Sequence, residues 1–411
     1  MYKPVLSLDV SKGSSYAATY LSMHEPFKKP VSVPHTPQGI SLLIDRLKNM
    51  ECLTGERPQV ILESTGNYSK PISCILQEAG YSVIVLNPIQ THQQKRRSIR
   101  KVKTDPVDAK RIAELFYMQN FKAQKPINPA IAELRVLCRH YDGINSLYIE
   151  SQLRFQSVLD LLFPYYSNVF STLCGDSSLH LLAAFPTPES VLAAAKEDVL
   201  ALLKAEYQRK GWVENIYDKL LAAARASLPY KVSQQSNIRV LREYIDILMT
   251  HKAQLADIRA QIVAAAKEIS VYSLLRTIPG VGEITAAVIL AEIEDVNRFS
   301  VDHQLTAYAG LDASVFESGK FKSSRNKISK RGSAYLRKAL FQAAKAAIRT
   351  TKKGPVNPLL QNYYLKKVSA GKPKMVALVA TANKLLRIIY GMWRKNEPFK
   401  LTWNQHGYCF S

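Results

Sequence analysis

The order of hydrophobic periods in the first 120 residues restricts the folds that this chain can form. Segments with the alternation or the short apolar runs of strands come first, and helical patterns separate the later strands. Strands are expected at 4–10, 15–22, 30–34, 59–62 and 81–86, and helices at 38–50, 68–79, 88–98 and 105–118. Three strands followed by alternating helices and strands indicate a mixed α/β domain of the ribonuclease-H-like type, which we assign to residues 1–125.

The middle of the chain, residues 126–270, is predicted to be helical and to contain a coiled coil. A 3-4-3-4 spacing runs through Leu241, Tyr244, Leu248, His251, Leu255, Ile258, Ile262, Ala265 and Ile269. This period keeps one apolar seam facing a partner helix. His251 is its polar position and is interpreted as a register-setting or partly exposed residue. The partner helix can belong to the same chain or to a second copy, and we favour a second copy.

Positive charge is concentrated near the C-terminus. The segment 318–396 contains no Asp or Glu but 20 of the 56 Lys and Arg, whereas the rest of the chain holds 36 basic and 33 acidic side chains. A globular surface normally mixes charges of both signs, so this block favours a polyanionic partner. Neutralising phosphates releases counterions, which supplies most non-specific affinity for nucleic acid. The alternative is a basic face that is simply solvated.

Composition limits the other classes of protein. A length of 411 residues is enough for two or three domains with buried cores. No apolar run reaches the roughly 20 residues that span a bilayer, and the N-terminus lacks the form of a signal peptide, so we expect a cytosolic protein without a membrane span. The five cysteines form no CxxC pair and the eight histidines no HExxH, which argues against a zinc site or a disulfide scaffold.

Residues 271–411 are predicted to form a mainly helical basic domain that opens with a helix-hairpin-helix. The turn Pro279-Gly280-Val281-Gly282 separates a helical segment from the helix 283–293. Glycines let backbone N–H groups approach a phosphate closely, and the following helix N-terminus favours an anion. Gly280 and Gly282 are therefore candidate nucleic-acid contacts.

Four carboxylates in the N-terminal domain are candidate metal ligands. Asp9 lies on the first strand between apolar neighbours, and Glu63 ends the strand at 59–62. Asp105 and Asp108 are three residues apart, so they face one side of a helix. In a ribonuclease-H-like fold these elements converge at one edge of the sheet. Four hard oxygen ligands there would suit a pair of Mg²⁺ ions roughly 3.5–4 Å apart, which serve phosphodiester cleavage.

Each carboxylate also has an ordinary structural interpretation. Asp105 precedes Pro106, which suits the first helical position, so Asp105 can be only an N-cap. Glu63 can be an ordinary strand end. Four clustered carboxylates would repel one another without a cation, however, which favours the metal site when they are considered together.

Ser318 is a candidate nucleophile at the head of a basic loop. A serine that attacks phosphorus forms a covalent phosphoester, which conserves the bond for rejoining. Cations in the loop can hold the phosphate and stabilise its additional charge: Lys320, Lys322, Arg325, Lys327, Lys330 and Arg331. Spacing alone leaves the choice open, because Ser323, Ser324 and Ser329 lie in the same loop and serines there can also be phosphate binders.

Two further basic sets are expected to contact a nucleic-acid backbone. One precedes the helix of Asp105 and comprises Lys95, Arg96, Arg97 and Arg100. The other shares a face of the helix after Ser333 and comprises Lys338, Lys345 and Arg349. Contacts of this kind position a protein on nucleic acid without reading its sequence.

Several motifs in both halves of the chain resemble those of insertion-sequence-110 family transposases. The N-terminal motifs are Asp9 on its strand, Glu63-Ser64-Thr65-Gly66, Asn87-Pro88 and Lys103-Thr104-Asp105-Pro106-Val107-Asp108-Ala109. The C-terminal motifs are Ile278-Pro279-Gly280-Val281-Gly282, Ala309-Gly310-Leu311, Glu317-Ser318-Gly319 and Ser329-Lys330-Arg331-Gly332. They occur in the family's order, and residues 126–270 carry no motif that can be transferred.

The resemblance implies a RuvC-like DEDD domain, a coiled-coil dimerisation region and a C-terminal serine transposase domain. It implies that Asp9, Glu63, Asp105 and Asp108 hold Mg²⁺ and that Ser318 attacks DNA to give a 5′-phosphoserine linkage. It also implies a structured bridge RNA that pairs with donor and target DNA. The active site would then form between subunits of a dimer or tetramer.

Three functions remain as hypotheses. The first, which we favour, is an RNA-guided, Mg²⁺-dependent serine recombinase that moves a mobile element within a bacterial or archaeal cell, near the nucleoid. The second is a RuvC-like nuclease in which water attacks and Ser318 is idle. The third is a nucleic-acid-binding protein without catalytic activity.

Overall fold

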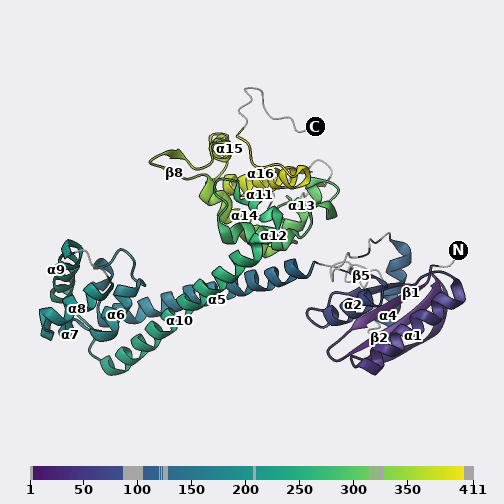
Figure 1. Ribbon diagram of the computed structural model, residues 1–411, viewed down its shortest axis with the longest axis horizontal. Coiled ribbons are helices and arrows are strands. Elements are labelled where there is room, and N and C mark those ends of the chain that lie inside the picture. Colours follow the sequence, from purple (N-terminus) through teal and green to yellow (C-terminus); the bar gives the residue numbers. More distant parts are fainter. Residues whose placement is uncertain are drawn as a thin grey trace. The chain divides into compact units, whose positions relative to one another are not determined.

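The computed structural model describes residues 3–86, 105–119, 121, 123, 128–206, 210–313, 317–318, 321–322 and 327–401 (Figure 1). It divides the chain into two compact units, Met1–Ile127 and Asn128–Ser411, and each unit is described by itself below. Some expected features lie outside the described residues: the helix at 88–98, Lys95, Arg96, Arg97, Arg100, Lys320 and Arg325.

A five-stranded mixed sheet forms the centre of the first unit. Its strands are β1 (Val5–Val10), β2 (Ser14–Ser22), β3 (Glu25–Pro34), β4 (Gln59–Glu63) and β5 (Ser82–Leu86). They lie in the order β3-β2-β1-β4-β5, with β1, β2 and β3 antiparallel in succession and with β1, β4 and β5 parallel. The expected mixed α/β sheet is confirmed, and four of its strands lie within a residue or so of the expected positions, whereas β3 begins at Glu25 rather than near residue 30.

Helices cover both faces of this sheet, because alternate side chains of each strand point to opposite sides. Helices α1 (Pro37–Thr54) and α2 (Ser69–Glu78) pack on the face that contains Leu6 and Leu8. Helix α4 (Asp105–Met118) packs on the other face, with Val5 and Ile61. Any residue on β1 at an odd-numbered position therefore lies on the face that α4 covers.

The second unit begins with two long helices that pack against each other. Helix α5 (Pro129–Leu162) returns as α10 (Gln234–Lys267), and buried residues near the start of α5 share a core with the end of α10, so the pair is antiparallel. Between them in sequence lie short helices that pack at one end of the pair. These are η1 (Tyr166–Asn168), α6 (Asp176–Ala184), α7 (Pro188–Ala193), α8 (Lys196–Glu206) and α9 (Lys210–Ala226).

The C-terminal part of this unit is mainly helical and packs around the other end of the pair, as Figure 1 shows. Its helices are α11 (Ser270–Arg276), α12 (Glu283–Ile293), η2 (Val296–Arg298), α13 (Asp302–Ala309), α14 (Ala334–Ala347), α15 (Pro358–Ser369) and α16 (Lys374–Lys395). Two short hairpins, β6–β7 and β8–β9, interrupt them. The expected mainly helical C-terminal region is confirmed.

Among the helices in the described ranges, only α16 is long and apolar enough to span a membrane. A helix buried in a protein core can have the same length and apolarity. Leu385, Leu386 and Ile389 of α16 are fully buried in the C-terminal core.

The predicted apolar seam finds its partner within the chain, so our preference for a second copy is wrong for this surface. Leu241 and Leu248 pack with α5 in the core of the short helices, and Ile258 and Ile262 pack with α5 in the C-terminal core. His251 is half-buried, as expected for a partly exposed seam position. Periodicity specifies a buried stripe, but it cannot say which helix covers that stripe.

Leu248→Ala should lower the free energy of unfolding by about 2–5 kcal/mol, because it leaves a cavity between α10 and α5. The matched control is Ile247→Ala at the neighbouring position, where the side chain is 40% exposed rather than 0%. Denaturant unfolding at two protein concentrations measures both variants. A loss for Leu248→Ala that appears only through concentration-dependent association would contradict the intrachain packing.

Candidate active site

Asp9 and Glu63 lie beside each other at the carboxyl ends of neighbouring parallel strands. The register pairs Leu8 of β1 with Leu62 of β4, and both carboxylates are the next residues along. Because side chains alternate, Asp9 and Glu63 fall on the face that α4 covers. Both are half-buried. The sheet therefore brings two of the four predicted carboxylates to one edge and one face.

A side-chain hydrogen bond holds the first turn of α4 over this edge. The Ser7 hydroxyl, two residues before Asp9 and on the same face, donates to the Ala109 carbonyl oxygen at 2.8 Å. Asp108 directly precedes Ala109 and is only 5% exposed, whereas Asp105 is exposed. Helix α4 begins at Asp105, so Asp105 lies in the first turn rather than one position before it. The start of α4, which carries Asp105 and Asp108, therefore lies next to β1, the strand of Asp9.

Asp108 is paired with a cation of its own helix. Arg111 Nη1 donates to Asp108 Oδ1 at 3.1 Å, and both side chains are largely buried. Among the residues that the structure describes, no three Asp, Glu, His or Cys side chains are gathered closely enough to hold a metal ion. Neighbouring carboxylates repel one another, and the positive charge of Arg111 offsets the negative charge of Asp108. The donor set itself, hard carboxylate oxygens on one face, fits a hard divalent cation.

Ser318 lies in a two-stranded hairpin of the second unit. Strand β6 (Glu317–Ser318) pairs with β7 (Phe321–Lys322), in a register that places Ser318 opposite Phe321. Of the predicted loop cations in the described ranges, Lys327, Lys330 and Arg331 are exposed.

Two glycines close the base of the loop that carries this hairpin. A Cβ atom on Gly332 would lie 1.9 Å from the Tyr308 carbonyl oxygen and 2.6 Å from the backbone nitrogen of Gly310. Gly310 ends α13 with φ +65°, a conformation that suits glycine. A bridge between Ala313 and Ile328 joins the strands of the loop just beyond. The chain therefore leaves and re-enters the helical core at one point, and Ser318 lies between.

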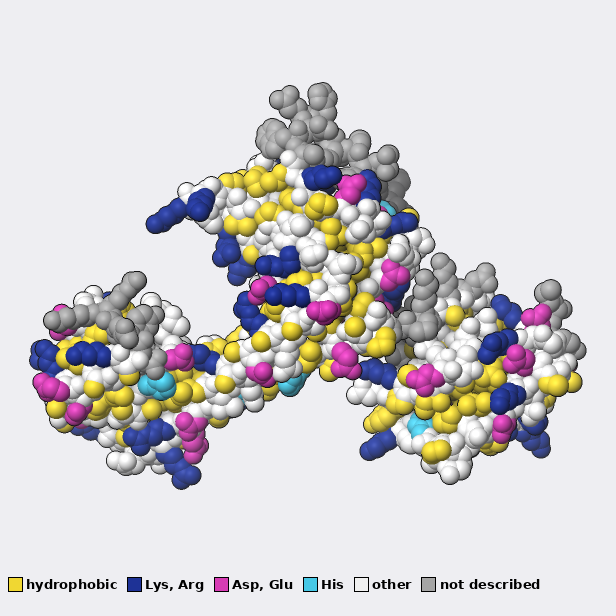
Figure 2. Space-filling model, viewed as in Figure 1, with side chains coloured by type: hydrophobic (Ala, Val, Ile, Leu, Met, Phe, Trp, Pro, Cys, Tyr) yellow, Lys and Arg dark blue, Asp and Glu magenta, His cyan; other side chains and the backbone are white. Residues whose placement is uncertain are grey.

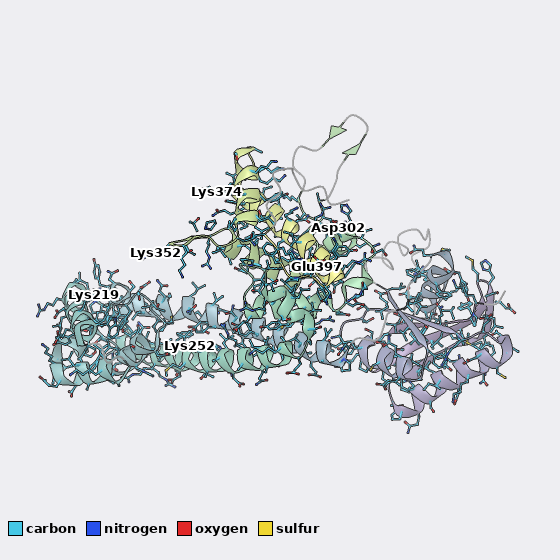
Figure 3. All side chains as sticks on the ribbon, turned by 45° about the horizontal axis from the view of Figure 1, so that its top comes forward. Lys219, Lys252, Asp302, Lys352, Lys374 and Glu397 are labelled. Atoms are coloured by element: carbon cyan, nitrogen blue, oxygen red, sulfur yellow. The ribbon has the colours of Figure 1, made fainter. Side chains whose placement is uncertain are left out.

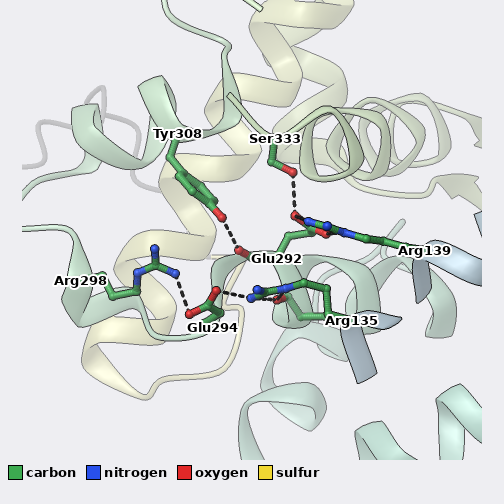
Figure 4. A network of polar contacts seen from close by, with 8 residues as sticks. Arg135, Arg139, Glu292, Glu294, Arg298, Tyr308 and Ser333 are labelled. Carbon is green, nitrogen blue, oxygen red and sulfur yellow. Dashed lines mark hydrogen bonds and ion pairs between the residues drawn. The ribbon is translucent and has the colours of Figure 1, made fainter. Parts of the chain in front are cut away.

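A buried carboxylate, Glu292, links three helices beneath this loop (Figure 4). Glu292 is 1% exposed, and Arg139 of α5 donates to both of its oxygens, at 2.8 and 3.1 Å. Ser333, the N-cap of α14, donates its hydroxyl to Glu292 Oε2 at 2.8 Å and accepts the backbone N–H of Leu336. Hydrogen bonding to Glu292 raises the pKa of Arg139, so this arginine stays charged.

A second ion pair extends the network along α5. Arg135 donates to the Ala291 carbonyl oxygen at 2.8 Å and also pairs with Glu294. Glu294 has φ +65° and accepts a further ion pair from Arg298 at 2.8 Å. These contacts fix the end of α12 on the long helix.

Sequence reasoning missed this network. Its signal in the sequence is Glu292, which interrupts the apolar run 286–293, together with two arginines that are four residues apart, Arg135 and Arg139. Such spacing places both arginines on one face of a helix.

The predicted nucleic-acid contacts of the C-terminal region differ in how exposed they are and in what they contact within the protein. A Cβ atom on Gly280, which has φ +99°, would lie 2.7 Å from the backbone of Ala347, so close packing and the turn already require glycine there. Gly282 is exposed and is the N-cap of α12. Lys338 is paired with Asp142 of α5, whereas Lys345 and Arg349 are exposed. Arg349 lies beyond the end of α14 at Ala347, not on the helix as expected.

Comparison with known proteins assigns the chain to a family. Residues 6–164 match the family model of a transposase with a DEDD domain, and residues 272–365 match the transposase family IS116/IS110/IS902. An α/β sheet with acidic residues at one edge, followed by a basic helical region, agrees with a transposase of this class. The chain belongs to the IS116/IS110/IS902 family of transposases.

Three relatives illustrate the similarity. A "probable family 20 transposase" of Pseudomonas aeruginosa is 29% identical over 45% of this chain and 52% of its own length. The transposase for insertion sequence element IS1111A of Coxiella burnetii is 31% identical over 39% of this chain and 43% of its own length. A pilin gene-inverting protein of Moraxella bovis is 35% identical over 31% of this chain and 38% of its own length. The alignments thus span about half of these relatives or less.

Ser333→Ala should lower the free energy of unfolding by about 2 kcal/mol, because α14 loses its N-cap and the buried Glu292 loses a donor. The control is Ser146→Ala on α5, where the exposed hydroxyl donates to the Asp142 carbonyl oxygen of the same helix. Thermal unfolding followed by circular dichroism compares the two. Equal losses for both variants would show that the Glu292 contact contributes little.

Proposed function

We propose that this protein is the transposase of an insertion sequence, which cuts and rejoins DNA. The observation that carries the proposal is the position of Asp9 and Glu63 at adjacent strand ends, beneath the helix turn that bears Asp105 and Asp108. Two carboxylates at neighbouring strand ends on one face repel each other, and a bound cation would offset that repulsion, which favours a catalytic role for Asp9 and Glu63. Family membership and relatives named for transposition and gene inversion support the same conclusion.

In this proposal the N-terminal unit is a RuvC-like DEDD domain whose four carboxylates hold Mg²⁺, in a pair of ions. Bound Mg²⁺ would stabilise the charge that develops on the phosphoryl oxygens. The residues of the chain have separate parts in this arrangement. Ser7 keeps α4 in place over β1, and Arg111 pairs with Asp108.

Ser318 is the proposed nucleophile. Its Oγ would form a bond to the phosphorus of a DNA strand while the bond from phosphorus to the 3′ oxygen breaks and leaves a 3′-hydroxyl group. The 5′-phosphoserine keeps the energy of the phosphodiester, so a different 3′-hydroxyl can reverse the step and join new ends. The closed base at Gly310 and Gly332 supports this role, because a fixed base presents the hairpin in a limited range of positions.

DNA is the proposed substrate, and a structured guide RNA and further copies of the chain are proposed partners. The acid-free basic segment 318–396 supports binding to phosphates of either nucleic acid. Because the carboxylates and Ser318 belong to different units, a site that combines them can form between subunits of a dimer or tetramer. The setting would be the cytoplasm, at the nucleoid.

Ser318→Ala should abolish the covalent protein–DNA adduct and strand exchange, because it removes the oxygen that would bond to phosphorus. Alanine substitutions of Ser323, Ser324 and Ser329 are the matched controls and should retain the adduct. Denaturing gel electrophoresis of labelled DNA detects it. If Ser318→Ala still cuts DNA at the same rate without an adduct, water is the nucleophile and the protein is a nuclease.

Asp9→Asn should reduce DNA cleavage at least roughly 100-fold while leaving DNA binding intact, because several kcal/mol of charge stabilisation depends on the ion that Asp9 holds. Removal of Mg²⁺ with a chelator should have the same effect on the wild type. Asp45→Asn, at an exposed position on α1, is the control. Undiminished strand exchange by Asp9→Asn would refute the metal site and favour a protein that only binds.

A further inference from the structure

A short basic hairpin projects from the C-terminal helices and has no part in the site described above. Strands β8 (Thr350–Thr351) and β9 (Gly354–Pro355) connect α14 to α15. In Figure 1 the hairpin at the label β8 extends away from the helical layer. Figure 3 shows Lys352 at its outer end. Lys352 and Lys353 form the turn, and both side chains are exposed.

The tip of this hairpin is held in one conformation. Gly354 has φ +108°, which glycine adopts without strain after a two-residue turn. The Thr351 hydroxyl donates to the Gly354 carbonyl oxygen at 2.9 Å and accepts the backbone N–H of Lys353 at 3.3 Å. Two lysines are thus displayed on a turn whose backbone is already ordered, which lowers the entropy cost of binding through them.

The base of the hairpin is clamped by α15. Gln361 donates from Nε2 to the Ile348 carbonyl oxygen at 3.0 Å and to the Thr350 hydroxyl at 2.9 Å. The backbone N–H of Val356 closes the base by donating to the Arg349 carbonyl oxygen. A two-stranded hairpin is at best marginally stable alone, so these contacts are what allow it to project. The hydrogen bonds from Gln361 therefore hold the hairpin in a position that keeps its two lysines away from the core.

The charge at the tip is not balanced locally. The segment 318–396 has no acidic residue, and in the described parts of the chain neither Lys352 nor Lys353 forms an ion pair. In Figure 2 Lys and Arg side chains lie at the end of this projection, with no acidic side chain beside them in that view. Arg349 adds an exposed cation at the base.

We propose that the β8–β9 hairpin is a wing that contacts the phosphate backbone of duplex DNA, with Lys352 and Lys353 each neutralising one phosphate. The proposal rests on the proposed function, that the chain acts on DNA. Lysine ammonium groups act as point charges towards phosphate, whereas base recognition favours the planar fork of arginine. The wing should thus add affinity without sequence preference.

The test compares Lys352→Gln/Lys353→Gln with two matched double variants of the full-length protein. Lys352→Arg/Lys353→Arg keeps the charge, and Lys204→Gln/Lys219→Gln removes the same charge from exposed positions on α8 and α9. Affinity for a 30-base-pair duplex of arbitrary sequence is measured by fluorescence anisotropy at several salt concentrations. A duplex RNA of equal length is measured in parallel.

The glutamine pair at the tip should lower the slope of log affinity against log salt by about 1.8, or about 0.9 per phosphate, and weaken binding roughly tenfold or more at physiological salt. Both control variants should keep the wild-type slope. An unchanged slope for the tip variant, with normal DNA binding by the wild type, would overturn the wing and leave the proposed function intact. A loss restricted to RNA would overturn the assignment to DNA. A wild type that binds no DNA would overturn both proposals.

Discussion

The buried carboxylate of Glu292 must be hydrogen-bonded, and the packing of three helices in the second unit provides its donors. A carboxylate that is almost fully buried is expensive unless it is paired and hydrogen-bonded, so its partners must be brought to it. Arg139 comes from the long helix α5, and Ser333 begins α14. The need to pair this one charge thereby joins three helices of the second unit, α5, α12 and α14. Removing one partner would leave a buried charge without its donor, which is strongly destabilising.

The first unit shows the opposite use of charge. Asp9 and Glu63 lie on one face of the sheet at the ends of neighbouring strands, and Asp108 of α4 pairs with Arg111 of the same helix. The Ser7 bond holds α4 against β1. In the proposed function these carboxylates bind a cation, whereas Glu292 joins three helices of the second unit.

Much of the fold followed from periodicity, and the exceptions have identifiable causes. The alternation of β1 predicted its strand, because side-chain direction in a strand has a fixed period. The heptad spacing around Leu248 predicted burial correctly but not the partner, which is α5. Gly280 was expected to allow close approach of a phosphate, and the structure shows that the backbone of Ala347 packs closely against it. Lys338 was expected on a free face but pairs with Asp142, a residue nearly 200 positions away.

By itself the sequence determined the local elements, the acid-free basic segment, and the residue types from which a catalytic site can be built. Those properties depend on neighbours along the chain and on composition. Tertiary structure alone decided that Glu63 lies beside Asp9, that Gly310 meets Gly332, and that two lysines stand at the tip of a clamped hairpin. Two-residue strands carry no detectable period, and contacts between distant segments depend on how whole helices and sheets pack.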